Sequence, residues 1–374
     1  MAQCEIALVV HPLHLWGGGE YYLQVLSDLL PKASIYTAWY RPVFVNQYFP
    51  EHKIVASYLQ KLPMKNHFSK ELIPLLPKAY KRFDFRDYQL VIVVSDGFEK
   101  NLTVQGSTKV WLHILTPPRF LWLENRASQQ SNKLTYKIYK SIFEKNLHQR
   151  WRHLDKEATG RADFLTSISN TVAERVKRYY GLTSEILYPP VEMDNYTQDT
   201  LPKSREEWFL YFGRIEAYKG IELAIKACIK LKKKLCIAGT GADTERLKLI
   251  VMEMNGSRYI EFLGFVSDEE KWNLFQRCQA LIYPVKDEDF GIVPVEANSA
   301  GTPVIAYAGG GANETIINKK TGLLFKRYTV EALTEQIGIL PKVNIDPEAC
   351  RLQACKYSRE IFEEKISAII EKLI

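Results

Sequence analysis

The sequence has few residues that could hold a fold together through covalent or metal bonds. Its 374 residues include six cysteines and seven histidines, and no cysteines stand in a Cys-x-x-Cys pair or another metal-ligand spacing. Cys228, Cys236 and Cys278 lie in apolar stretches, which is typical of buried thiols. We therefore predict reduced, buried cysteines, a cytoplasmic location and a fold that rests on a hydrophobic core.

Long apolar runs are also missing. None approaches the roughly 18 residues needed to span a bilayer, and the first residues, MAQCEIALVV, lack the basic start and long apolar stretch of a signal peptide. We expect any contact with a membrane to be peripheral, on its inner face. The composition is 46% hydrophobic and 25% charged, which excludes a disordered or low-complexity chain, and the length suits two domains.

The net charge of +7 is unevenly spread. Two basic runs lie in the N-terminal half: Lys61, Lys65, Lys70, Lys78, Lys81, Arg82 and Arg86, and then Arg126, Lys133, Lys137, Lys140, Lys145, Arg150 and Arg152. Each run is either a solvated helix face or a surface that attracts anionic lipid or a polyanionic acceptor. No recognition motif accompanies the charge, so nucleic acid is not expected as a partner.

Short apolar runs alternate with amphipathic helical patterns, which indicates parallel α/β architecture. The expected strands span 5–10, 33–38, 53–57, 89–95, 109–115 and 164–169, and then 208–212, 235–238, 259–263, 280–283, 303–306 and 322–325. These patterns predict two Rossmann-like domains, 1–188 and 189–358. A segment rich in Pro, Asp and Asn at 187–199 suits a linker, and an amphipathic helix at 359–374 can dock on either domain, including back on the first.

The first predicted strand leads into a glycine-rich loop. The strand is followed by His11, and Gly17, Gly18 and Gly19 precede the next helix. Glycines allow a ligand close to the backbone, and a helix N-terminus attracts an anion. A tight turn is the alternative. The loop does not match the GxGxxG pattern of dinucleotide enzymes, and no role is assigned to His11 or His14.

Charged residues follow two strands of the second domain. Arg214 and Lys219 lie around the turn after strand 208–212, where two cations can clamp a diphosphate or simply be solvated. After strand 280–283 come Glu288 in a loop and Glu296 in the next helix, with backbone amides between them that suit an anion. A further glycine-rich loop at 309–311 also suits phosphate. Ordinary strand-to-helix loops are the alternative for each piece.

These motifs resemble the retaining GT-B glycosyltransferases of family 4, the glycosyl transferases group 1. The resemblance rests on residues 16–20, Phe-Gly-Arg-Ile-Glu-Ala-Tyr-Lys-Gly at 212–220, Gly239-Thr-Gly241, Phe262-Leu-Gly-Phe265 and the E-x7-E pair Glu288/Glu296. Residues 309–315 and 115–122 are similar to the polysaccharide and O-antigen mannosyltransferases. Leu115 stands where a histidine commonly precedes the Thr-Pro of that subgroup, and His113 lies on the same side of an extended strand.

The resemblance implies a GT-B fold, with two Rossmann-like α/β domains facing each other across a cleft. The first would take the acceptor and the second the nucleotide sugar. Arg214 and Lys219 would neutralise the donor diphosphate and, with Glu288 beside the sugar, carry catalysis, while Glu296 would hold the ribose. The other donor contacts would come from Gly17, Gly18, Gly19, Gly213, Gly239, Gly241, Phe290, Gly291, Ile292 and Val293. His113 and Arg119 would contact sugar or acceptor, with a hydrogen-bonded core position as the alternative for His113.

The expected reaction is retaining transfer of a hexose, with mannose from GDP-mannose favoured, onto a glycan or lipid-linked saccharide. Asp287 and Asp289 match the Asp-x-Asp string that binds metal in the other main glycosyltransferase fold, but they overlap the E-x7-E motif. We therefore expect no metal and no cofactor beyond the donor. The alternatives are a UDP-sugar donor, an epimerase or phosphorylase of the same fold, and a catalytically silent sugar-nucleotide-binding protein.

Overall fold

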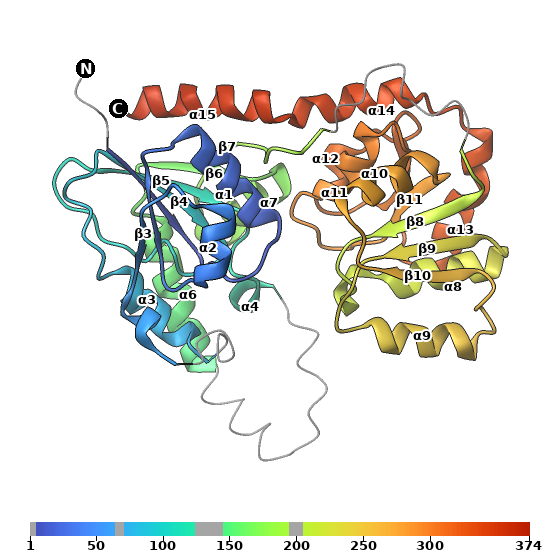
Figure 1. Cartoon of the computed structure of the whole chain (residues 1–374), viewed down its shortest axis with the longest axis horizontal. Coiled ribbons are helices and arrows are strands. Elements are labelled where there is room, and N and C mark those ends of the chain that lie inside the picture. The colour runs from blue at the N-terminus through green and yellow to red at the C-terminus, as the bar shows by residue number, and fades with distance from the viewer. Residues whose placement is uncertain (1–4, 64–70, 124–144, 194–204) are drawn as a thin grey trace, which may run out of the picture. The chain divides into compact units, whose positions relative to one another are not determined.

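The computed structural model describes residues 5–63, 71–123, 145–193 and 205–374. The chain divides into two units, the first comprising residues 1–189 with 362–374 and the second residues 190–361. Each unit is a parallel sheet covered by helices (Figure 1). Several basic residues of the two runs lie outside the described residues: Lys65, Lys70, Arg126, Lys133, Lys137 and Lys140.

The first unit has a seven-stranded sheet in the order β3-β2-β1-β4-β5-β6-β7. Its strands are β1 Ile6–Val10, β2 Ser34–Thr37, β3 Ile54–Ala56, β4 Leu90–Ser95, β5 Lys109–Ile114, β6 Phe164–Ser167 and β7 Glu185–Ile186. All neighbours pair in parallel, with Leu8 of β1 opposite Ile35 on one side and Ile92 on the other. Strand β4 is buried along its whole length, and its first five residues, 90–94, read as one apolar run.

The helices of the first unit lie on both faces of this sheet (Figure 1). They are α1 Gly18–Leu29, α2 Pro42–Tyr48, α3 Leu76–Tyr80, α4 Arg119–Trp122, α6 Lys145–Thr159 and α7 Asn170–Tyr180. Most of α15, Arg359–Leu373, also belongs to this unit, because the unit takes in residues from Phe362 onward. Phe362 is buried, and its ring packs edge-on against Tyr22 of α1 at a centroid distance of 5.0 Å.

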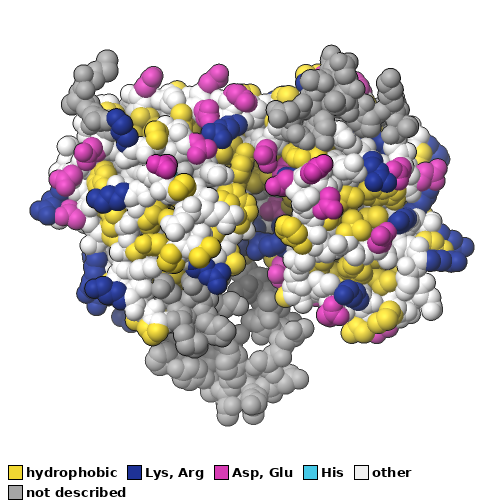
Figure 2. Space-filling model, in the orientation of Figure 1, with side chains coloured by type: hydrophobic (Ala, Val, Ile, Leu, Met, Phe, Trp, Pro, Cys, Tyr) yellow, Lys and Arg dark blue, Asp and Glu magenta, His cyan; other side chains and the backbone are white. Residues whose placement is uncertain are grey.

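The surface carries charges of both signs. On the face shown in Figure 2, Lys and Arg side chains lie among Asp and Glu side chains on both units. The described members of the first basic run are exposed, namely Lys61, Lys78, Lys81, Arg82 and Arg86. Among the helices that the structure describes, none has the length and apolar character of a membrane-spanning segment.

The second unit has a six-stranded parallel sheet in the order β10-β9-β8-β11-β12-β13. Its strands are β8 Trp208–Phe212, β9 Lys234–Ala238, β10 Ile260–Gly264, β11 Ala280–Tyr283, β12 Val304–Tyr307 and β13 Gly322–Phe325. Its helices are α8 Ile221–Leu231, α9 Thr244–Glu253, α10 Asp268–Arg277, α11 Ile292–Ser299, α12 Ala312–Thr315, α13 Val330–Ile339 and α14 Pro347–Ala354. The predicted α/β class with two Rossmann-like units is confirmed.

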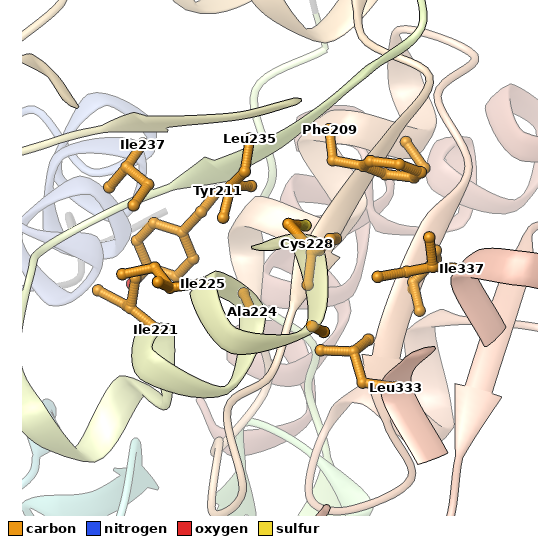
Figure 3. Close-up of a cluster of buried hydrophobic side chains, with 14 of the residues drawn as sticks. Phe209, Tyr211, Ile221, Ala224, Ile225, Cys228, Leu235, Ile237, Leu333 and Ile337 are labelled. Atoms are coloured by element: carbon orange, nitrogen blue, oxygen red, sulfur yellow. The ribbon is translucent and has the colours of Figure 1, made fainter. Parts of the chain in front are cut away.

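The core of the second unit lies where α8 and α13 pack on the sheet. Figure 3 shows Tyr211 and Phe209 of β8 packed with Ile225 and Cys228 of α8, and Leu333 of α13 beside them. Cys228 is fully buried, and burial raises the pKa of its thiol to about 12. Cys236 and Cys278 are also buried, so the prediction for these three thiols is confirmed.

Candidate active site

The candidate site of the second unit lies at the carboxyl ends of β8 and β11, which are neighbours in the sheet. The strand order changes direction here, because β9 follows β8 on one side while β11 lies on the other. Loops that leave such neighbouring strands part from each other and leave a crevice that suits a ligand. The loop after β8 carries Arg214 and Lys219, and the loop after β11 carries Glu288.

Three predicted donor glycines have structural reasons that the sequence did not reveal, close packing for Gly239 and Gly241 and a positive φ for Gly213. A Cβ on Gly239 would lie 2.0 Å from the backbone oxygen of Gly213, and one on Gly241 would lie 2.1 Å from that of Ile215. Gly213 and Gly239 also have φ values of 135° and 133°, which side chains rarely allow. The loops after β8 and β9 therefore pack backbone against backbone, and ligand contact by these glycines stays a prediction.

The glycines at 309–311 support the loop that carries Glu288. A Cβ on Gly310 would lie 2.2 Å from the Glu288 backbone oxygen, and one on Gly311 would lie 2.1 Å from that of Phe290. The Gly311 N–H donates to the Glu288 carbonyl at 3.0 Å. Phe290 is buried, and its ring packs edge-on against Tyr357. The backbone of residues 288–290 is thus held on two sides, and this fixes the backbone position from which the Glu288 side chain extends.

The Glu288 carboxylate joins two donors at one oxygen. Lys219 Nζ lies 2.7 Å from Glu288 Oε2, and the Tyr283 hydroxyl donates to the same oxygen at 2.5 Å. The Lys219 and Glu288 side chains are each 15% exposed. Burial, and then the charge of Glu288, raise the pKa of Tyr283 far above its ordinary value, so this hydroxyl remains a donor. Tyr283 ends β11 and was missed in the sequence, where it reads as one more buried strand residue.

Arg214 is the second predicted cation of this loop. Its side chain is exposed and makes no hydrogen bond or ion pair with another residue that the structure describes. Its backbone oxygen accepts from the Tyr211 hydroxyl at 3.0 Å, which ties the turn to the buried end of β8. The backbone of Arg214 is therefore held in place, while its exposed guanidinium is available to an anionic ligand.

Glu296 lies on α11 and is held by a lysine that was not predicted. Lys271 Nζ of α10 lies 3.1 Å from Glu296 Oε1 and 3.2 Å from Asp268 Oδ1. Lys271 and Glu296 are 5% and 9% exposed. Burial raises the pKa of the Glu296 carboxyl, and the charge of Lys271 opposes this. The sequence did hold a signal for the burial of Lys271, because its spacing from Phe275 places both residues on the buried face of one helix.

The N-terminus of α11 lacks a side-chain cap, and ligand binding there stays a prediction. Its N-cap is Gly291, whose φ of 89° lies in the left-handed region and which offers no side-chain cap. The first helical residues, Ile292 and Val293, therefore have amides that no side chain of the N-cap satisfies. Among the described residues there is no group of three His, Cys, Asp or Glu arranged to hold a metal ion, and metal independence remains a prediction.

The glycine loop of the first unit holds an ion pair. His11 Nε2 lies 2.7 Å from Glu20 Oε1, and His11 Nδ1 lies 3.9 Å from Asp96 Oδ1. Burial alone would lower the pKa of His11, but Asp96, Glu20 and Glu99 outweigh it and raise the pKa to about 10. Gly17 caps α1, and Gly18 and Gly19 begin it. Pairing of His11 with Glu20 was missed because nine residues separate them.

Two further residues were predicted to contact sugar or acceptor. His113 is fully buried, accepts or donates one hydrogen bond with Thr166 Oγ1 at 2.8 Å, and stacks on Tyr22 at a centroid distance of 4.6 Å. Burial lowers its pKa to about 3, so the ring is neutral. His113 thus occupies the hydrogen-bonded core position that was its alternative. Arg119 begins α4 and is partly exposed.

Known proteins resemble part of this chain in sequence. Residues 192–355 match the model of the family described as Glycosyl transferases group 1. The mouse alpha-1,3/1,6-mannosyltransferase ALG2 is 26% identical over 262 residues, which cover 59% of this chain and 61% of the mouse protein. A glycogen synthase of Mycobacterium tuberculosis is 34% identical over 158 residues, which cover 41% of this chain and 37% of that protein. The matches thus span less than two thirds of these relatives' lengths.

Solved structures match the fold along nearly the whole chain. Sucrose-phosphate synthase from Thermosynechococcus elongatus has a TM-score of 0.75 at 20% identity and covers 99% of both chains. The Anabaena HepE protein in complex with UDP has a TM-score of 0.73 at 14% identity, over 98% of this chain and 100% of that one. The predicted resemblance to the GT-B glycosyltransferases of group 1 is confirmed.

Proposed function

We propose that this chain, a relative of the group 1 glycosyl transferases with their GT-B fold, transfers a hexose from a nucleoside diphosphate sugar. The observation that carries the proposal is the convergence of Lys219, Glu288 and Tyr283 at adjacent strand ends, close in sequence to the unpaired guanidinium of Arg214. A cation-rich strand edge beside a helix N-terminus suits a diphosphate. The likeness to ALG2, named a mannosyltransferase, supports mannose and hence GDP-mannose, and the UDP held by HepE keeps a UDP-sugar as the alternative.

The proposed mechanism is leaving-group catalysis with retention of the α configuration. Negative charge develops on the diphosphate as the bond to the sugar breaks, and Arg214, Lys219 and the amides that begin α11 would stabilise it. Positive charge develops on the sugar, where the Glu288 carboxylate would favour it. These groups supply the charges that the reaction needs without a metal, and we propose that none is required.

Glu296 would accept hydrogen bonds from the ribose hydroxyls. Its carboxylate is buried and already has one partner, Lys271, so its position on α11 is fixed before a ligand arrives. A carboxylate oxygen has more than one acceptor site, so a pairing with lysine still allows a ribose hydroxyl to donate to it. Such a contact is the same in ground and transition states, which makes Glu296 a donor-binding group.

The acceptor would be a glycan or lipid-linked saccharide, as in polysaccharide biosynthesis, and would bind the first unit. A lipid-linked acceptor suits peripheral contact with an anionic membrane, because the described part of the first basic run is exposed. Binding to anionic vesicles that falls as salt rises would support this contact, and equal binding to neutral vesicles would contradict it.

A thermal-unfolding screen with GDP-mannose, UDP-glucose and related nucleotide sugars tests the donor. A ligand that binds only the folded chain raises its unfolding temperature, so the true donor gives the largest shift. Release of nucleoside diphosphate is then followed with and without saccharide acceptors. Acceptor-dependent release supports a transferase, conversion of the donor without acceptor indicates an epimerase, and binding without turnover indicates a silent binding protein.

A further inference from the structure

We infer that Glu288 is an internal competitor of the donor diphosphate for Lys219, so that the diphosphate must bind before Glu288 can serve the sugar. The inference deepens the proposed function and rests on it. The Glu288 carboxylate would pair first with Lys219 and then, once the diphosphate is bound, with the sugar in the same site.

The geometry supports the competition. Glu288 Oε2 is 2.7 Å from Lys219 Nζ, and each side chain is only 15% exposed, so water screens the pair weakly. A diphosphate that uses Lys219 needs the same ammonium protons. It would also lie beside the Glu288 carboxylate, and like charges in a poorly solvated site repel. Binding of the diphosphate therefore favours movement of Glu288 away from Lys219.

The backbone of Glu288 is held in place, so any movement is confined to its side chain. Its backbone oxygen accepts from the Gly311 N–H, and the close approach of Gly310 holds the same peptide. Rotation about the side-chain bonds can carry the carboxylate from the lysine while the loop stays in place. The loop thus defines a short path for the carboxylate rather than a rearrangement of the site.

Tyr283 gives the displaced carboxylate a second partner. Its hydroxyl already donates to Glu288 Oε2 at 2.5 Å, and it belongs to β11 rather than to the lysine loop. A carboxylate that leaves Lys219 can keep this bond, so it is not stranded without a donor in a partly buried site. Tyr283 is therefore a positioning residue that lowers the cost of release.

The consequence is an order of events. Before the diphosphate binds, Glu288 neutralises Lys219, and the site holds a compensated pair. Once the diphosphate takes Lys219, the carboxylate no longer pairs with the lysine and can face the sugar on which positive charge develops. Sugar contact through Glu288 is thus coupled to occupation of the diphosphate position, which would disfavour binding of a free sugar alone.

The experiment measures the affinity of the full chain for UDP and GDP by calorimetry, with uridine and guanosine as probes that lack phosphates. Glu288→Gln removes the competing charge and should bind the preferred diphosphate about 3–10-fold more tightly, with nucleoside binding unchanged. Tyr283→Phe removes the second partner and should bind the diphosphate about 2–5-fold more weakly. Thermal unfolding of each variant confirms that it is folded.

A double-mutant cycle with Lys219→Met distinguishes competition for Lys219 from general repulsion between Glu288 and the diphosphate. The gain from Glu288→Gln should shrink in the Lys219→Met background, because no lysine is left to compete for. Glu261→Gln is the matched control. It removes one negative charge from the same sheet, where Glu261 pairs with Lys234 at 2.8 Å on a half-exposed surface, and should leave the affinity unchanged.

The outcomes separate this inference from the proposed function. If neither nucleoside diphosphate binds the wild-type chain, the proposed function fails and the inference fails with it. If a diphosphate binds but Glu288→Gln does not tighten it, or tightens it equally in the Lys219→Met background, the competition is wrong while the proposed function stands. Opposite shifts for Glu288→Gln and Tyr283→Phe, with the gain dependent on Lys219, support the inference.

Discussion

Replacing Lys271 by methionine tests how strongly the second unit depends on one buried ion pair. The Lys271 side chain is 7% exposed and that of its partner Glu296 is 11% exposed. Methionine has a similar length and can fill the same space, so the variant mainly removes the charge. Glu296 is then left buried without the lysine. Asp268, the other partner, has an 88% exposed side chain and can turn to water.

The expected loss is about 2–4 kcal/mol of unfolding free energy. Breaking a fully buried pair by removal of one partner costs about 3–5 kcal/mol, and the residual exposure of both side chains reduces this. For a unit of this size the loss corresponds to a fall of roughly 5–12 °C in its unfolding temperature. Scanning calorimetry of the full chain measures it.

The loss should depend on pH. Without Lys271, burial holds the pKa of Glu296 further above its value in the unfolded chain, so Glu296 takes up a proton on folding. A carboxyl group whose pKa is raised in the folded state lowers the stability of the fold at pH values above that raised pKa. It does not lower stability at pH values below its pKa in the unfolded chain. Lys271→Met should therefore cost more at pH 8 than at pH 5.

A double-mutant cycle with Glu296→Gln tests whether the loss comes from the stranded Glu296 charge. Neutralising both partners removes the stranded charge, so the double variant should be more stable than the sum of the two single losses predicts, by at least about 1 kcal/mol. Additive losses, or a loss for Lys271→Met that is the same at pH 5 and pH 8, would show that the pair does not couple these helices.

Three further predictions concern the loops and the metal. Gly311→Ala places a Cβ 2.1 Å from the Phe290 backbone oxygen and should lower the free energy of unfolding by more than about 2 kcal/mol. Gly338→Ala, in open space on α13, should raise the free energy of unfolding by about 0.5–1 kcal/mol. Calorimetry should show changes of opposite sign for the two variants, and changes of the same sign would contradict the prediction. Burial and then Asp96 raise the pKa of Glu99 to about 7, so the wild-type chain should lose stability as pH rises toward 7 relative to Glu99→Gln, and parallel pH profiles would contradict it. Turnover should survive EDTA, and loss restored by Mn²⁺ would refute metal independence.

The strands of both units could be predicted because a buried parallel strand is a short apolar run between polar segments, and the run at 90–94 shows this plainly. Strand β7, Glu185–Ile186, has two residues and no pattern to detect. The short α2 was also missed, since a helix of two turns barely develops a periodicity. The capping box of Ser267 and Glu270 at the start of α10 can be read from the sequence, because both of its partners are local.

Residues of the candidate site could be named from the sequence where their motifs are local, whereas pairings that depend on the tertiary structure could not. Lys219 and Glu288 were identified from motifs, but their ion pair joins residues far apart in the chain. Lys271 and Tyr283 act through partners on other elements, so in the sequence Lys271 reads as a surface lysine and Tyr283 as one more buried strand residue. Gly239 and Gly241 were named from the family resemblance as ligand contacts, whereas the structure shows backbone atoms close to them; a glycine in the sequence does not tell a close backbone from a close ligand.

Steady-state release of nucleoside diphosphate from the preferred nucleotide sugar, in the presence of a saccharide acceptor, tests the central claim most directly. The account predicts turnover by the wild-type chain. Glu288→Gln should lower kcat by about 10²–10³-fold, as expected for the loss of one contact to developing charge, while Glu296→Gln should mainly raise the donor KM. The absence of release with any nucleotide sugar, or full activity in Glu288→Gln, would contradict the placement of the active site at these strand ends.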